Sequence, residues 1–487
     1  MKLFSLSLFL FLSCASVSAA APNIVFILAD DMGYGDVQTL NPKSKIPTPN
    51  IDRLAREGMT FTDAHSSSAV CTPTRYSVVT GRYCWRSKLK SGVLNGYGEP
   101  LIEADRPTVA SFLKKNAYHT GVIGKWHLGL GFQKNDDGSW NWKKPLTYSP
   151  KTLGFEYSYV IPASLDFPPY IYIENGVITE EPSETQTNSP FPKYWRKGER
   201  APGFIFEDCL DHLTEKARAY IKEQADKAKP FMLYFPLTSP HKPALPHKRF
   251  QGKSGLGPYG DFVMQTDWTV GSVLDAIDEA GIADNTLVIY TSDNGSYMYR
   301  YDDDSKPDHV KDESVQGFFS GNHTANGVLR GTKADVWEAG HRVPFFARWP
   351  KQIKAGSTCD RTICSVDFFS TAAEAAGLNL PPSREAAQDS FSLIPLFKGK
   401  KNWKRAPVIH HSSGGTFAIR NGEWKLIMGS GSGGREQPRG KKFAHPWHLY
   451  NMKEDLSEQD NRLTSERTVV QDLETQALSI IANGRSR

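Results

Sequence analysis

Asn23-Ile24-Val25-Phe26-Ile27-Leu28-Ala29 is a continuous apolar run that leads directly into Asp30-Asp31-Met32-Gly33. A run of this kind, without alternation of polar residues, is typical of a parallel strand that is buried on both faces. In open α/β sheets, ligands bind at the carboxyl ends of such strands. The stretch therefore predicts an α/β sheet with paired aspartates at its ligand-binding edge. The alternative is an ordinary polar turn after a strand.

A second apolar run repeats this pattern. Asn285–Thr291 is followed by Ser292-Asp293-Asn294-Gly295, which again places oxygen-bearing side chains at the predicted carboxyl end of a buried strand. Asn294-Gly295-Ser296 also matches a glycosylation sequon. If Asn294 binds a metal ion, it is buried and we expect it to remain unmodified.

The stretch Cys71-Thr72-Pro73-Thr74-Arg75 is predicted to begin a helix. Proline is favoured in the first turn of a helix, because its missing N–H would have no helical partner there. Free amides and the helix dipole favour anions at this end, and Arg75 projects from the same turn. The segment is thus a candidate anion site that contains a nucleophile. An ordinary buried cysteine is the alternative.

Basic side chains follow two further predicted strands. Lys125 and His127 alternate after Tyr118–Ile123, so both can point to one face, where they would orient and deprotonate a nucleophile. His241 lies after the strand Phe231–Phe235, in a stiff loop between prolines. The alternative for Lys125 and His127 is an ordinary strand end in contact with solvent. The alternative for His241 is a histidine that only makes local hydrogen bonds.

Several of these stretches resemble a known family. Cys71–Arg75 followed by Thr80-Gly81-Arg82 resembles the first signature of the type I sulfatases, and Gly124–Gly129 resembles their second. The resemblance runs from Ile24 to about Leu463 and is nearest to the arylsulfatase A and N-acetylgalactosamine-6-sulfatase side of the family. It implies an α/β, alkaline-phosphatase-like fold, in which helices flank a mixed, mostly parallel sheet and a smaller antiparallel-sheet subdomain follows at the C-terminus.

The resemblance also implies a mechanism. In the family the cysteine is oxidised to formylglycine, an aldehyde whose hydrate is the nucleophile, so Cys71 would become 3-oxoalanine. Calcium is the usual family metal, and it tolerates an irregular set of oxygen ligands better than magnesium does. The implied ligands of one Ca²⁺ are Asp30, Asp31, Cys71, Asp293 and Asn294. The implied catalytic residues are Cys71, Arg75, Lys125, His127, His241 and Lys333.

Each catalytic residue has an implied role. Arg75, Lys125 and Lys333 would hold the sulfate oxygens. His241, or alternatively Lys333, would protonate the leaving alcohol, and His127 would take the proton from the second hydroxyl of the hydrate.

The resemblance implies a sulfated carbohydrate of galactose or N-acetylgalactosamine type as substrate, and a formylglycine-generating maturation enzyme as partner. We expect the Lys143–Asn175 stretch and the loop with His410 and His411 to line the rim of the pocket. The aromatic residues between Phe132 and Tyr172 would either stack on sugar rings or pack against one another.

The N-terminal sequence and the charge indicate the cell compartment and limit the possible partners. Met1–Ala20 has a lysine, an apolar run and a small-residue exit, which is typical of a secretory signal peptide. The protein is therefore expected to be secreted or periplasmic, or lysosomal in a eukaryote, with lipid attachment at Cys14 as a lesser alternative. No later segment is apolar enough to span a membrane. The net charge is +5, and the only basic block singled out is Arg435–Lys442, so no nucleic-acid binding is expected.

The chain is divided into a catalytic domain, 21–377, and a C-terminal α+β subdomain, 378–487, because Leu380-Pro381-Pro382 separates helices from short alternating strands. Outside the signal and the motif, Cys84, Cys209, Cys359 and Cys364 remain, and spacing alone does not settle whether they pair.

Two other functions compete with a sulfatase. A phosphoesterase of the same superfamily would usually carry Ser or Thr as nucleophile and ligands for a second metal. A glycan-binding relative without turnover would have lost Cys71, Arg75 or His127, and all three are present.

Overall fold

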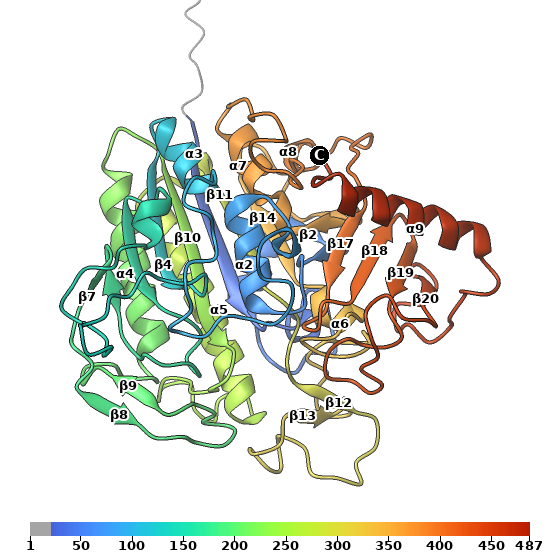
Figure 1. Ribbon diagram of the computed structural model, residues 1–487, viewed down its shortest axis with the longest axis horizontal. Coiled ribbons are helices and arrows are strands. Elements are labelled where there is room, and N and C mark those ends of the chain that lie inside the picture. Colours follow the sequence, from blue (N-terminus) through green and yellow to red (C-terminus); the bar gives the residue numbers. More distant parts are fainter. Residues whose placement is uncertain (1–20) are drawn as a thin grey trace, which may run out of the picture.

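A ten-stranded sheet forms the centre of the computed structural model, which describes residues 21–487 (Figure 1). The strand order is β15-β2-β14-β11-β1-β10-β4-β5-β6-β7. The five central strands are parallel: β11 (Thr286–Ser292), β1 (Asn23–Asp30), β10 (Phe231–Pro240), β4 (His119–Lys125) and β5 (Tyr157–Ile161). Strand β1 is buried from Ile24 to Asp30, as its continuous apolar run predicted.

Shorter strands extend both edges of this sheet. Antiparallel pairing joins β14 to β11 and β2 on one side, and β6 to β5 and β7 on the other, while β15 runs parallel to β2. The sheet is thus mixed and mostly parallel, which confirms the predicted fold class. These edge strands are β14 (Phe345–Arg348), β2 (Met59–Phe61), β15 (Ser357–Cys359), β6 (Ile173–Glu174) and β7 (Val177–Ile178).

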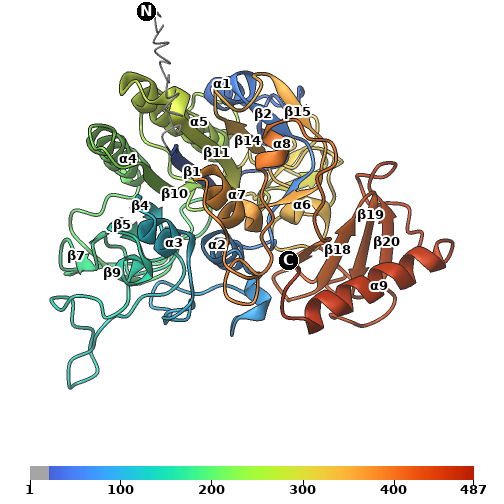
Figure 2. The same ribbon diagram turned by 90° about the horizontal axis from the view of Figure 1, so that it is seen from above.

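Helices cover both faces of the sheet (Figure 2). One face carries α1 (Pro49–Glu57), α4 (Cys209–Ala225) and α5 (Gly257–Glu279). The other face carries α2 (Cys71–Thr80), α3 (Val109–Lys115) and α7 (Phe368–Ala375). Because both faces are covered, the central strands have no polar side, which explains their continuous apolar sequences.

A separate four-stranded antiparallel sheet lies in the C-terminal part of the chain. Helix α9 (Arg467–Ala482) packs on it through Leu473, Ala477 and Ile480. Its order is β17 (Val408–His411), β18 (Phe417–Asn421), β19 (Trp424–Met428) and β20 (His448–Asn451). This sheet confirms the predicted antiparallel subdomain.

Smaller elements complete the fold. They are β3 (Ala64–His65) with β16 (Ile363–Cys364), β8 (Glu184–Gln186) with β9 (Gly198–Arg200), β12 (Tyr299–Tyr301) with β13 (Gly317–Phe319), and the short helices α6 (Glu338–His341) and α8 (Ile394–Phe397).

Two expectations from the sequence concern the N-terminus and the cysteines. The predicted signal peptide and Cys14 lie outside the described residues. Within the described residues, no helix has the length and apolarity needed to cross a membrane. Cys71, Cys84, Cys209, Cys359 and Cys364 are all free thiols there, so the pairing considered for Cys359 and Cys364 is not formed.

Candidate active site

The polar residues that follow β1 and β11 lie next to each other, because the two strands pair in parallel. Ala29 is in register with Ser292, and the backbone N–H of Asp293 donates to the carbonyl of Ala29 at 3.0 Å. Asp31 adopts a left-handed conformation with φ of 67°. Its backbone N–H donates to Oδ1 of Asp293 at 3.3 Å. The two predicted pairs of polar residues therefore form one cluster at the carboxyl edge of the sheet.

Asn294 completes this cluster. Its Nδ2 donates to Oδ1 of Asp31 at 2.6 Å, whereas its Oδ1 is buried and finds no hydrogen-bond partner within residues 21–487. A buried acceptor without a partner costs free energy, and a cation would satisfy it. Carboxylate oxygens of Asp30 and Asp293 lie within 4.8 Å of each other and of the Cys71 thiol. These residues are therefore a candidate metal centre.

Cys71 is the first residue of α2 and is 2% exposed. Helix α2 begins here because Val70 is extended and Pro73 falls in the first turn. Burial raises the pKa of the Cys71 thiol, although Lys125 and Lys333 lower it in part. An unmodified Cys71 is thus held as the neutral thiol, a weak nucleophile.

Arg75 lies one turn further along α2 and binds the cluster. Its Nε and Nη2 donate to Oδ2 of Asp293 at 2.9 Å and 2.6 Å, and its Nη1 donates to the carbonyl of Lys125 at 2.9 Å. The guanidinium is fully buried. In this geometry Arg75 orients a carboxylate of the candidate metal centre, and its predicted contact with sulfate stays a prediction.

Two lysines bind the other two carboxylates. Nζ of Lys125 lies 2.7 Å and 2.9 Å from the oxygens of Asp30. Nζ of Lys333 lies 2.6 Å and 2.8 Å from those of Asp31. With Arg75, the three cations lie against three buried carboxylates.

His127 offers a free lone pair in this site. Its Nε2 lies 2.7 Å from the carbonyl of Leu94, so this nitrogen carries the proton and donates it. Its Nδ1 is buried and has no partner among the described residues. Burial, together with the positive charge of Lys125, holds the pKa of His127 well below its usual value. His127 is therefore a neutral base.

His241 directly follows β10 and faces the same carboxylates. Its Nε2 lies 3.5 Å from Oδ2 of Asp31, while its Nδ1 donates to the carbonyl of Lys242. Burial lowers the pKa of His241 to about 3, even though Asp31 raises it in part. The ring is therefore neutral, with the lone pair of Nε2 turned toward the cluster.

The comparisons with known proteins agree with this site. A family model described as Sulfatase matches residues 22–378, which include every candidate catalytic residue. The chain belongs to the sulfatase family. A second model, described as the N-sulphoglucosamine sulphohydrolase C-terminal region, matches residues 332–482. The protein is thus an enzyme that hydrolyses sulfate esters.

Named relatives cover most of the chain. An N-acetylgalactosamine-6-O-sulfatase of Bacteroides thetaiotaomicron is 35% identical over 93% of this chain and 91% of its own length. Human arylsulfatase A is 32% identical over 86% of this chain and 77% of its own length. A solved structure from work on the metabolism of multiple glycosaminoglycans by Bacteroides thetaiotaomicron is 31% identical, with a TM-score of 0.81, and covers 95% of this chain and 99% of that chain.

Ser292 joins the two loops of the sulfatase that carry Asp31 and Asp293, and it was not among the predicted site residues. Its hydroxyl accepts from the backbone N–H of Met32 at 2.9 Å and donates to the carbonyl of Asn294 at 2.8 Å. Its only signal in the sequence is its place directly before Asp293. The backbone carbonyl of Leu94, which orients His127, could not be predicted from the sequence, because every residue has a backbone carbonyl.

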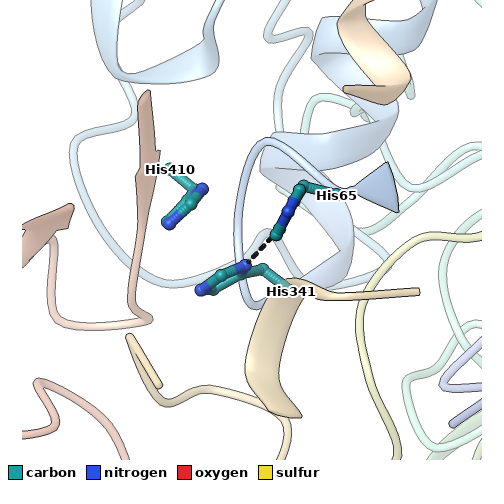
Figure 3. Close-up of side chains that lie close together, drawn as sticks. All are labelled: His65, His341 and His410. Atoms are coloured by element: carbon teal, nitrogen blue, oxygen red, sulfur yellow. Dashed lines mark hydrogen bonds between the residues drawn. The ribbon is translucent and has the colours of Figure 1, made fainter. Parts of the chain in front are cut away.

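His410 and His411 are not at a pocket rim, which corrects the expectation from the sequence. Both are buried, with 0% and 1% of their surface exposed. Figure 3 shows His410 beside His341 and His65, and its ring stacks on His341 with centroids 3.6 Å apart. Both residues belong to β17 rather than to a loop, and β17 places His410 against His65 of β3 and His341 of α6. His410 is therefore a packing residue of that contact.

Replacing His410 tests this correction. His410→Phe keeps a flat ring, so we expect the free energy of unfolding to change by less than about 1 kcal/mol, and His410→Ala to lower it by about 1–3 kcal/mol. Neither change should alter KM for a sulfated sugar. Urea denaturation and steady-state kinetics check this, and a raised KM in both variants with stability intact would restore a substrate-binding role.

The aromatic residues near Phe132 mostly pack against one another. Trp140 stacks on Tyr97, with centroids 5.3 Å apart, and Tyr157 stacks on Tyr220 at 5.7 Å. Phe167 is different, because its ring lies 6.0 Å from that of His127. Trp140 and Tyr157 thus pack against other rings, whereas Phe167 borders the candidate site.

Proposed function

We propose that this enzyme removes sulfate from a carbohydrate, of galactose or N-acetylgalactosamine type, with a formylglycine formed from Cys71 and one bound calcium ion. The observation that carries the proposal is the convergence of Cys71 with the carboxylates of Asp30 and Asp293 at the edge of the sheet, where Asp31 lies beside Asp30. The similarity to an N-acetylgalactosamine-6-O-sulfatase supports the choice of sugar.

The donor set fits calcium. Asp30, Asp31 and Asp293 offer carboxylate oxygens, and the unpartnered Oδ1 of Asn294 offers a fourth position. Calcium accepts such all-oxygen sets, whereas structural zinc prefers cysteine and histidine ligands at short spacing. These residues, with the side chain at position 71, would hold the ion.

Formylglycine fits position 71 because the site needs a nucleophile stronger than a neutral thiol. If formed, its hydrate would supply one hydroxyl for attack on sulfur and a second for release of sulfate, and a bound metal ion would supply Lewis-acid chemistry. Two surrounding residues, Lys125 and Lys333, neutralise the negative charge on the oxygens of a bound sulfate.

The two histidines move protons at defined atoms. Nδ1 of His127 is free to accept a proton, because Nε2 is fixed as the donor to Leu94. Nε2 of His241 gains a proton when an anion is bound beside it, since a neighbouring negative charge raises the pKa of an imidazole. It then donates this proton to the leaving alcohol.

The maturation enzyme and the cell compartment follow from the same proposal. Formation of the aldehyde requires a formylglycine-generating enzyme as partner, and the predicted signal peptide indicates secretion or export to the periplasm.

A panel of sulfated mono- and oligosaccharides tests the substrate. We expect the highest kcat/KM on galactose or N-acetylgalactosamine sulfates. Activity confined to nitrophenyl sulfate, or highest on glucosamine sulfates, would contradict the choice of sugar while leaving the sulfatase activity intact.

Calcium removal is expected to lower both activity and stability. Chelation with EDTA should abolish sulfate ester hydrolysis, and Ca²⁺ at a hundredfold excess over its Kd should restore about 2.7 kcal/mol of stability. In Asn294→Ala the calcium-induced rise in Tm should shrink or vanish. Thermal denaturation with and without Ca²⁺ measures this rise in Tm.

Asn326→Ala is the matched control, because Asn326 is also buried but its Oδ1 already accepts from Ser296. This variant should keep the calcium-induced rise in Tm. An equal rise in Asn294→Ala would remove Asn294 from the ligand set.

A further inference from the structure

A groove of about 1340 Å³ lies between an edge of the large sheet and the C-terminal sheet. One wall is formed by residues at the ends of β2 and β15, the other by the turn Asn421–Glu423 between β18 and β19, and the segment Leu396–Arg405 borders it. No residue of the candidate active site lines it. The groove is therefore separate from the catalytic centre.

The groove is strongly cationic. Ten lysines and arginines line it, against three acidic residues, Asp63, Asp360 and Glu423. Seven of the cations are exposed and form no ion pair with any carboxylate of residues 21–487. These seven are Lys354, Arg361, Lys398, Lys400, Lys401, Lys404 and Lys453. Unpaired like charges repel one another, so the groove favours a polyanion.

The floor of the groove adds a second, independent observation. The side chains of Arg342, Arg405 and Arg420 are only 9%, 6% and 5% exposed. Each has an ion pair, with Asp63 or Asp367. Even so, Nε of all three and Nη1 of Arg405 have no hydrogen-bond partner among the described residues. These nitrogens are covered by protein atoms, so an anion in the groove would be attracted by the charge of the three guanidinium groups rather than by these donors.

The groove also lies near the catalytic edge of the sheet. Phe61, at the end of β2, is in register with Phe345, which pairs with Thr291 near the end of β11. Only β14 separates β2 from β11, so the two strand ends are about 10 Å apart at the usual strand spacing. One extended molecule can reach both places.

We propose that this groove binds a sulfated polysaccharide chain and so holds a polymeric substrate beside the catalytic centre. The class of ligand rests on the proposed function, whereas the site itself rests on the exposed unpaired cations and on the three guanidinium groups at its floor. Trp403 supports a sugar chain over a compact anion. It lines the groove half-buried, and its Nε1 is held by the carbonyl of Ser392 at 2.7 Å, so the ring is fixed as a surface for a sugar.

Binding of chondroitin 6-sulfate chains tests the proposal. It is measured by calorimetry with the full chain carrying Cys71→Ala, so that no sulfate is removed. The double variant Lys400→Glu/Lys401→Glu should raise the Kd at least tenfold, and added salt should weaken binding to the parent protein. The matched control is Lys114→Glu/Lys115→Glu on α3, an equal charge change on exposed lysines away from the groove, which should change the Kd by less than threefold.

The outcomes separate this site from the catalytic one. With Cys71 intact, Lys400→Glu/Lys401→Glu should raise KM for the polymer and leave kcat/KM for nitrophenyl sulfate unchanged. An unchanged Kd, or an equal loss in the control, would overturn the site. Tighter binding of duplex DNA than of the polysaccharide at equal salt would overturn the ligand class. A failure of the proposed function would appear instead as inactivity on every sulfated sugar while polymer binding persists.

Discussion

Replacing Cys71 with alanine is expected to lower kcat/KM for sulfate esters by at least about 10³-fold and to leave Tm nearly unchanged. Cys71 is the side chain that the start of α2 places among the carboxylates of the candidate metal centre. Alanine favours the helix and fills nearly the same volume, so the fold should persist. Steady-state kinetics and thermal denaturation of the purified variant measure both effects.

Cys84→Ala is the matched control, because Cys84 is equally buried, at 1% exposure, and is also a free thiol. It lies outside the candidate site, so kcat/KM should stay within about twofold of the parent enzyme. Activity retained in Cys71→Ala would remove the proposed nucleophile.

Replacing Arg75 with methionine is expected to lower the free energy of unfolding by about 3–5 kcal/mol, because it removes one partner of a fully buried ion pair. Asp293 loses two hydrogen bonds at 2.9 Å and 2.6 Å. Sulfate ester hydrolysis should also be lost, since this carboxylate is a candidate metal ligand. Urea denaturation measures the stability, and kinetics measure the loss of activity.

Arg384→Met is the control for this experiment. The side chain of Arg384 is 77% exposed and its Nε lies 3.4 Å from Glu385, whose side chain is 54% exposed, and such surface pairs contribute at most about 1 kcal/mol. If the two variants were destabilised equally, Arg75 would not be the central cation of the site. A stable Arg75→Met enzyme with intact hydrolysis would refute both of its assigned roles.

The sequence predicts this fold well where short-range patterns determine it. The apolar run before Asp30 becomes the buried β1, and Pro73 marks the start of α2 at Cys71. The meeting of Asp31 with Asp293 follows from one rule, that carboxyl ends of parallel strands share an edge. These parts of the site therefore need no knowledge of distant contacts.

Other features depend on contacts that no local pattern encodes. Strand β4 ends at Lys125, and His127 lies beyond it with φ of 58°, so a left-handed turn rather than strand alternation places this histidine. His410 is buried because His65 and His341, which are distant in sequence, lie against it. The cationic groove has no local signal in the sequence, because segments from Lys354 to Lys453, with Lys398–Arg405 among them, come together only in the folded chain.

The mass of the tryptic peptide Glu57–Arg75 tests the central claim most directly, with protein produced alongside a formylglycine-generating system. The account predicts an aldehyde at position 71. An intact thiol at position 71, in a preparation that hydrolyses sulfate esters and in which a control sulfatase is fully converted, would contradict it.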